Sequence, residues 1–244
     1  RDYYASRGLG DVYKRQVMRM SEVFWIIAGL LLYACNSDVT VIKGEIEGLE
    51  GKITLAMIEP QTNDTVVIAE QDVVDGKIDL KSKGVSVPAW VWLNLDKGRS
   101  IDFIIDSHRK IQIEGSLADI GRISVTGSDL AEEYVFLQQL LEERYDMPLA
   151  ELEKMIHNLQ RREVLNSRGE FILASYRRRL EKFKRYRFEY IEKLIEMNPS
   201  QELSLFLIWD ELKDSADVQK RLFESMCIEN KESNIYQLLT ERLQ

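Results

Sequence analysis

The hydrophobic period of the chain changes near Gly127, and this change limits the folds that the chain can adopt. From Val39 to Gly127, apolar residues alternate with polar ones, whereas from Ser128 onward they follow a helical repeat of about 3.6 residues. The first pattern is typical of strands with one buried face and the second of amphipathic helices. The sequence therefore predicts an α+β fold, in which an N-terminal antiparallel β-sandwich (residues 35–127) is followed by an all-α helical bundle (residues 128–244).

Turn-forming residues divide the alternating half into short segments about ten residues apart, which is the spacing of a sandwich or a barrel-like antiparallel sheet. Asp75-Gly76 is the clearest of these turns, because aspartate and glycine both accept a positive φ at little cost. Strand-like residues flank it, Val73-Val74 before and Ile78–Leu80 after. We therefore expect a β-hairpin at Asp75-Gly76.

A series of amphipathic helices is expected in the second half. Ser128 is able to cap the first, Pro148 begins the second, and a long third helix runs from near Gly169 to Met197, where Asn198-Pro199 ends it. Three shorter helices, each opening on a serine, are expected over Ser200–Leu212, Ser215–Cys227 and Ser233–Leu243.

A short apolar run precedes the alternating half. Val23–Leu32 carries no charge, Arg19 precedes it, and Ala34-Cys35 closes it before polar residues resume. About ten apolar residues suit the core of a signal peptide, whereas a membrane-spanning helix needs roughly 20. The pattern resembles a bacterial lipoprotein signal, so residues 18–34 are predicted to be cleaved and Cys35 to carry the lipid. A short helix buried in a core is the alternative.

Residues 1–17 fit neither pattern, since they contain no Met and show no regular period. They resemble translated sequencing-adapter sequence, so we predict an artefact there with the true start at Met18 or Met20, and we exclude the stretch from fold analysis. A genuine basic N-terminal tail is the alternative.

The net charge and the cysteine content bear on which partners the protein binds and on whether it forms a disulfide. The net charge of −8 argues against nucleic acid as a general partner. The only cysteines are Cys35 and Cys227, so lipidation of the first would leave the second without an intramolecular disulfide partner. We expect Cys227 to be a small buried hydrophobic residue in a helix, with a free reactive thiol as the alternative.

Short motifs in both halves carry a family resemblance. They are Val41–Gly48, Gly51–Leu55, Val74–Ile78, Ile111–Gly115 and Val125–Ser128, with Met197–Ser200 in the helical half. Together they resemble the N-terminal domain of unknown function of TlpA-like thiol–disulfide interchange lipoproteins from Gram-negative envelopes. The resemblance covers about Val39 to Leu243. In that family a thioredoxin-like domain with Cys-x-x-Cys follows, and this motif is absent from the sequence.

The sequence offers no catalytic or metal-binding constellation. Dithiol exchange needs two thiols close together. His108 and His157 lie in different halves without a partner at metal-ligand spacing, and we expect the first in a solvated turn and the second on a helix surface. Neither a G-x-S-x-G nor a phosphate-loop motif occurs. We therefore predict no catalytic residue, metal or cofactor.

Two features suggest binding surfaces. Trp90 and Trp92 point the same way from one predicted strand, where they form either a platform for a ligand or the second buried face of the sandwich, the commoner arrangement. Basic residues dominate the segment that ends at Arg187, which itself interrupts the apolar stripe of the long helix. Such a run is either a solvated face or a site for an anionic partner or lipid headgroup. The residues of this possible site are Arg177, Arg178, Lys182 and Arg185.

These features predict a membrane-anchored lipoprotein of a Gram-negative cell envelope, facing the periplasm and acting as a non-catalytic binding or positioning module. Its expected partners are the membrane, through the anchor, and an envelope protein or a downstream thioredoxin-like domain. Two alternatives stay open. One is the N-terminal part of a truncated thioredoxin-like thiol–disulfide oxidoreductase, and the other is a glycan- or peptide-binding lipoprotein.

Overall fold

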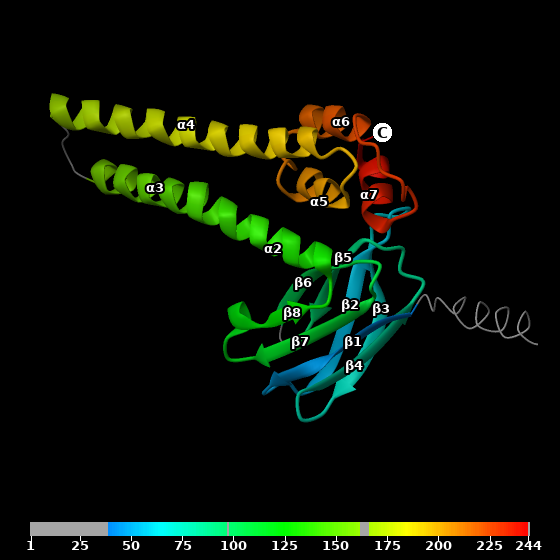
Figure 1. Cartoon of the computed structure of the whole chain (residues 1–244). Helices are drawn as coiled ribbons and strands as arrows, with labels where there is room; N and C mark the ends of the chain where they lie inside the picture. The colour runs from blue at the N-terminus through cyan, green and yellow to red at the C-terminus, as the bar shows by residue number, and fades with distance from the viewer. Residues whose placement is uncertain (1–38, 97, 162–165, 244) are drawn as a thin grey trace, which may run out of the picture. The chain divides into compact units, whose positions relative to one another are not determined.

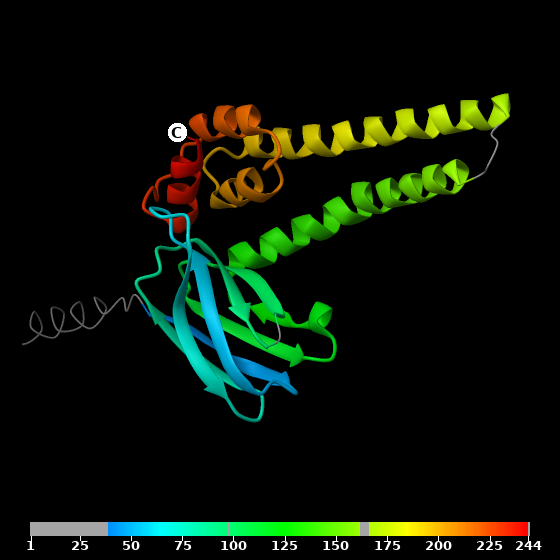
Figure 2. The same cartoon turned by 180° about the vertical axis from the view of Figure 1, so that it is seen from behind.

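A computed structural model describes residues 39–96, 98–161 and 166–243 of the chain. The part from Val39 onward forms one compact unit, in which a two-sheet sandwich is followed by helices (Figures 1 and 2). The predicted signal and Cys35 lie outside the described residues. Among the described residues, no helix is both long enough and apolar enough to cross a membrane.

The sandwich consists of two four-stranded sheets, with strand orders β4-β1-β7-β8 and β3-β2-β5-β6. Strands such as β4 alternate strictly between exposed and buried residues, as period two predicts. The predicted sandwich followed by helices is therefore confirmed. The strands are β1 (Val39–Glu47), β2 (Gly51–Ile58), β3 (Thr65–Val73), β4 (Lys77–Lys83), β5 (Ala89–Asn94), β6 (Ser100–Ile105), β7 (Lys110–Ser116) and β8 (Ser124–Thr126).

One strand pair departs from the antiparallel prediction. β1 pairs antiparallel with β4 but parallel with β7, where Ile42 lies opposite Ile111 and Gly44 opposite Ile113. Alternation along a single strand reports its buried face and not the direction of its neighbour, so the sequence pattern could not reveal this pairing. The two strands approach closely, because a Cβ atom at Gly44 would lie 1.7 Å from the carbonyl oxygen of Ile113.

The turn predicted at Asp75-Gly76 is present, and both residues have positive φ, 54° and 71°. The hairpin predicted around it is wrong, because β3 pairs with β2 while β4 pairs with β1. The turn instead carries the chain from one sheet to the other. Backbone preference at two residues specifies the turn, but the pairing of the flanking strands depends on the rest of the sheet.

The first two predicted helices form one continuous rod. α2 (Asp129–Leu141) starts at Ser128, whose Oγ accepts a hydrogen bond from Ala131 N at 3.1 Å, as the capping prediction requires. A π-helical turn, Glu142–Asp146, then joins α2 to α3 (Met147–Gln160). Pro148 lies in the first turn of α3, and the wide π-turn before it accommodates a residue without a backbone N–H.

The long helix α4 (Ser167–Met197) packs on α3, and three short helices follow it. They are α5 (Glu202–Asp210), α6 (Ala216–Glu224) and α7 (Asn234–Leu243). Of the serines expected to cap them, Ser233 accepts a bond from Tyr236 N at 3.4 Å, whereas Ser215 makes no capping bond and Gln201 stands at the start of α5.

Cys227 is exposed, so the prediction of a buried thiol is wrong. Helix α6 ends at Glu224, and the Ser225 hydroxyl donates to the carbonyl of Leu222 at 2.6 Å. Such a local side-chain bond competes with continuation of the helix. Cys227 therefore lies in the loop that follows, where its backbone N–H donates to the Pro199 carbonyl at 2.8 Å.

The described residues form two hydrophobic cores that meet at the outer face of β5 and β6. The sandwich core contains fully buried residues such as Leu55 and Val91. The helical core contains Phe206 and also takes in Ile104 of β6 and the half-buried Trp90 of β5. The helices thus pack directly on one face of the second sheet, and this junction positions the candidate site.

Candidate functional site

A groove of about 700 Å³ lies where an edge strand of each sheet meets α2. Strand β6 is an edge of the second sheet and β8 an edge of the first. Strand β6 lines the groove with Asp102, Phe103 and Ile104, β8 lines it with Ser124 and Val125, and α2 supplies the opposite wall. We call this the Trp90 groove, after the aromatic residue that β5 contributes to it.

Trp90 is fixed by two aromatic contacts. Its ring centroid lies 5.2 Å from that of Tyr134 in a T-shaped arrangement and 5.8 Å from that of Phe206. Its strand neighbours Ala89 and Val91 are fully buried in the sandwich, so strand alternation directs the Trp90 ring toward the helices. The aromatic wall of the groove is therefore in place before any ligand arrives.

The structure separates the two tryptophans proposed as a platform. Trp92 is half-buried on the same face as Trp90 and lies opposite Asp102 in the β5–β6 register. It is not among the residues that line the groove. Trp90 packs against helices and not against the opposite sheet, β4-β1-β7-β8, so the face that carries both tryptophans is covered in part by the helical core.

Acidic and amide side chains line the groove beside its apolar residues. Asp102 and Glu142 are exposed, Asp146 is half-buried, and Gln138 and Gln139 add amide groups from α2. The lining residues, all within the described part of the chain, include no Lys, Arg or His. The groove therefore combines an apolar aromatic wall with a negative rim, which favours a ligand that carries both apolar and cationic groups.

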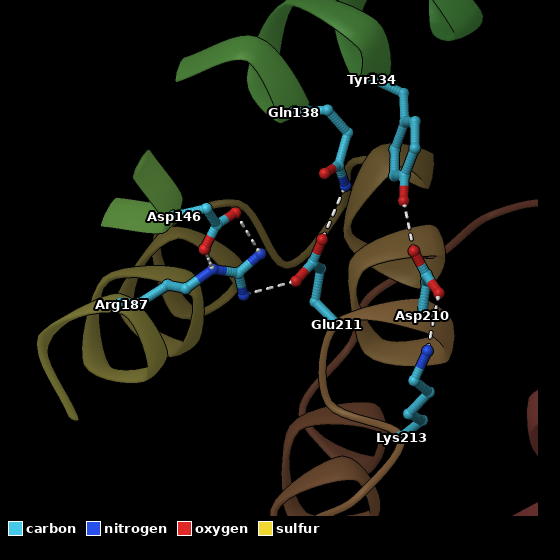
Figure 3. A network of polar contacts seen from close by, with 7 residues as sticks. All are labelled: Tyr134, Gln138, Asp146, Arg187, Asp210, Glu211 and Lys213. Atoms are coloured by element: carbon cyan, nitrogen blue, oxygen red, sulfur yellow. Dashed lines mark hydrogen bonds and ion pairs between the residues drawn. The ribbon is translucent and has the colours of Figure 1, made fainter. Parts of the chain in front are cut away.

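Two of these lining residues enter a network of polar contacts, shown in Figure 3. Arg187 of α4 donates from Nε to Asp146 Oδ1 at 2.7 Å, and Gln138 donates from Nε2 to Glu211 Oε1 at 2.7 Å. Burial alone would lower the pKa of Arg187, but its hydrogen bonds to Glu211 and Asp146 outweigh this effect and raise that pKa. Arg187 is thus a fixed cation that joins α4 to the wall of the groove.

Tyr134 belongs to both the groove and this network. Its hydroxyl donates to Asp210 Oδ2 at 2.8 Å, and Asp210 Oδ1 lies 3.6 Å from Lys213 Nζ (Figure 3). Burial, and then the hydrogen bond to Asp210, raise the pKa of Tyr134. The phenol therefore stays protonated at neutral pH and acts as a hydrogen-bond donor that holds α2 on α5.

The basic residues predicted to face an anionic partner are all exposed on α4: Arg177, Arg178, Lys182 and Arg185. At about 100° per residue, the last three share one stripe of the helix and Arg177 lies beside it. Arg185 Nε is 3.5 Å from Glu189 Oε1, and Lys182 Nζ is 5.2 Å from the ring centroid of Tyr186. This basic stripe is a different surface from the Trp90 groove.

Both histidines are exposed, as predicted. His108 Nδ1 lies 3.6 Å from Asp106 Oδ1 and 3.9 Å from Asp129 Oδ2, while His157 lies on α3. The ranges that the structure describes contain no group of three or more His, Cys, Asp or Glu side chains placed to hold a metal ion.

Sequence reasoning found Trp90 but missed the acidic rim. Asp102, Glu142 and Asp146 are scattered along the chain among 41 acidic residues, so no spacing distinguishes them. The one available signal was the position of Asp102 on a strand whose neighbours are apolar. Comparisons of the chain with models of protein families, with curated proteins and with solved structures found no match, so the resemblance to TlpA-like lipoproteins stays a prediction.

Proposed function

We propose that this protein is a lipid-anchored, non-catalytic binding module of the cell envelope, and that its Trp90 groove holds an extended peptide segment with basic side chains. The observation that carries the proposal is the combination of an aromatic wall, an acidic rim and an edge strand in one groove. Each of these three features favours a different part of such a ligand.

The edge strand β6 favours an extended backbone. Among the strands that the structure describes, β6 pairs with β5 alone, and three consecutive residues of β6, of which Asp102 is exposed, line the groove. An edge strand offers backbone N–H and C=O groups to which an added strand can pair. The alternating side chains of that strand would then contact the apolar wall and the acidic rim in turn.

The contacts of Trp90 and the position of Trp92 favour a peptide ligand over a glycan. A sugar stacks best on an exposed aromatic face, but Trp90 already contacts Tyr134 and Phe206, and Trp92 lies outside the groove. Apolar peptide side chains need only the wall that Trp90 and Val125 provide. Basic side chains find carboxylates at Asp102 and Glu142.

Calorimetric titration of the purified protein with an acetylated peptide of alternating valine and lysine tests this proposal. Binding should weaken several-fold in Asp102→Asn/Glu142→Gln and should also weaken as salt is added, because exposed charge pairs contribute about 0.2–1 kcal/mol each and are screened. A peptide of alternating valine and glutamate should not bind.

Glu133→Gln/Glu143→Gln is the matched control. Both residues are exposed and neither lines the groove, so the variant loses the same charge elsewhere and should bind like the wild type. A wild-type protein that does not bind the lysine peptide, or an equal loss in both double variants, would show that the groove is not the peptide site.

A further inference from the structure

A second groove, of about 430 Å³, lies between the π-helical turn and α4. It is lined by Arg144, Lys193 and three tyrosines, Tyr145, Tyr186 and Tyr190. The guanidinium carbon of Arg144 lies 5.5 Å from the ring centroid of Tyr145 and 5.4 Å from that of Tyr190. We call this the tyrosine groove. The guanidinium of Arg144 is held by two aromatic rings before any ligand binds.

The two cations of the tyrosine groove differ from several nearby basic residues in having no carboxylate partner among the described residues. On α4, Lys184 lies 3.6 Å from Glu153, and Arg187 pairs with Asp146 and Glu211. Arg144 and Lys193 form no ion pair with any residue that the structure describes. Two positive charges of the groove are thus available to a ligand.

One carboxylate, Glu189, also lines the tyrosine groove and would repel an anion by itself. Its Oε1 lies 3.5 Å from Nε of Arg185, so its charge is offset by a residue of the basic stripe. With Arg144 and Lys193 unopposed, the groove keeps a net positive charge. Lys182, whose Nζ lies 5.2 Å from the ring centroid of Tyr186, extends this charge along α4.

The three phenols supply neutral donors around these charges. Within the ranges described, the hydroxyl groups of Tyr145, Tyr186 and Tyr190 have no hydrogen-bond partner in the protein. Tyr186 is 41% exposed. A phenol hydroxyl without a protein partner is able to donate to an oxygen atom of an anion bound beside it.

We propose that the tyrosine groove binds a phosphate group, carried either by a soluble small molecule or by a lipid headgroup. A phosphate presents several oxygen acceptors, which suits one guanidinium, one ammonium and up to three phenols better than it suits a single cation. The aromatic contacts of Arg144 lower the entropy lost when it binds. The site shares no residue with the Trp90 groove, so the inference does not rest on the proposed function.

Titration of the unlipidated protein with inorganic phosphate, at constant ionic strength, tests the proposal for a soluble ligand. Sedimentation with phosphatidylcholine vesicles, with and without phosphatidylglycerol, tests it for a headgroup. In Arg144→Gln/Lys193→Gln the binding that the wild type shows should fall at least about tenfold, because the variant removes both cations that would form charge-assisted hydrogen bonds with the phosphate.

Arg179→Gln/Lys220→Gln is the matched control, since both residues are exposed and lie outside the groove. It should retain wild-type binding, and both variants should keep the far-UV spectrum of the wild type. Groove-dependent binding of phosphate alone identifies a soluble ligand, and groove-dependent binding of phosphatidylglycerol vesicles identifies a headgroup. Absence of both, or an equal loss in the control variant, overturns the proposal.

Discussion

Arg187 Nη1 donates to Glu211 Oε2 at 2.6 Å, and this contact joins the middle of α4 to the residue that follows α5. The side chain of Arg187 is 22% exposed and that of Glu211 only 8%. Arg187 is the charged residue that interrupts the apolar stripe predicted for the long helix. Its position is explained by carboxylates brought to it from two other elements, Asp146 in the π-turn and Glu211.

Replacing Arg187 with Met is expected to lower the free energy of unfolding by about 2 kcal/mol. The substitution preserves much of the side-chain volume but leaves the nearly buried Glu211 without its cation. Denaturant unfolding followed by circular dichroism measures the loss. Arg185→Met is the control, because the exposed Arg185–Glu189 pair should contribute less than about 1 kcal/mol. Equal effects of the two substitutions would show that the network does not stabilise the fold.

Tyr134 should make the protein less stable at high pH. Its folded-state pKa is raised above the unfolded value of about 10, so the stability that it provides is complete below that pH and is lost as pH rises further. Above about pH 10, the free energy of unfolding should fall by up to about 1.4 kcal/mol per pH unit from this group alone.

Tyr134→Phe tests this expectation, since it removes the hydroxyl that donates to Asp210 while retaining the ring that packs on Trp90. The variant should be less stable at neutral pH but should lose less stability between about pH 10 and 11. Tyr186→Phe, which changes an exposed phenol, should keep the wild-type slope. An unchanged slope in Tyr134→Phe would contradict the assignment.

Residue patterns predicted elements and their faces more successfully than they predicted partners. Ser128 caps α2 and α4 ends at Met197, because capping and the Asn198-Pro199 stop are local effects. The parallel β1–β7 pair and the Trp90 groove depend on segments far apart in the chain, which a local period does not encode. The sequence pattern did not predict the π-helical turn either. Within this turn, Glu142 lines the Trp90 groove and Arg144 lines the tyrosine groove.

Cys35 is predicted to carry the lipid anchor. Cys35→Ala should therefore accumulate as unprocessed precursor and should fail to incorporate a radioactive or alkyne fatty acid during growth. Two acyl chains would give the processed wild type stable membrane attachment, at roughly 0.8 kcal/mol per buried methylene. Cys227→Ala is the control and should be processed and acylated normally. Equal incorporation by both variants would rule out Cys35 as the attachment site.

The shared junction predicts that the sandwich and the helices unfold together. Trp90 and Ile104 belong to strands of the sandwich but pack in the helical core, and Ile104 is only 1% exposed. Phe206 lies in that core against Trp90 and is fully buried. Damage to the helical side of the junction should therefore destabilise both halves of the molecule.

Phe206→Ala is expected to lower the free energy of unfolding by about 3–5 kcal/mol, because it removes a buried aromatic ring and leaves a cavity beside Trp90. Phe136→Ala is the matched control, since Phe136 on α2 is 68% exposed and its loss should change stability by less than about 0.5 kcal/mol. The same unfolding experiment should be monitored both by far-UV circular dichroism and by tryptophan fluorescence. Coincident transitions that shift together in Phe206→Ala are expected, whereas two separate transitions, with only the helical one shifted, would show that the halves are independent.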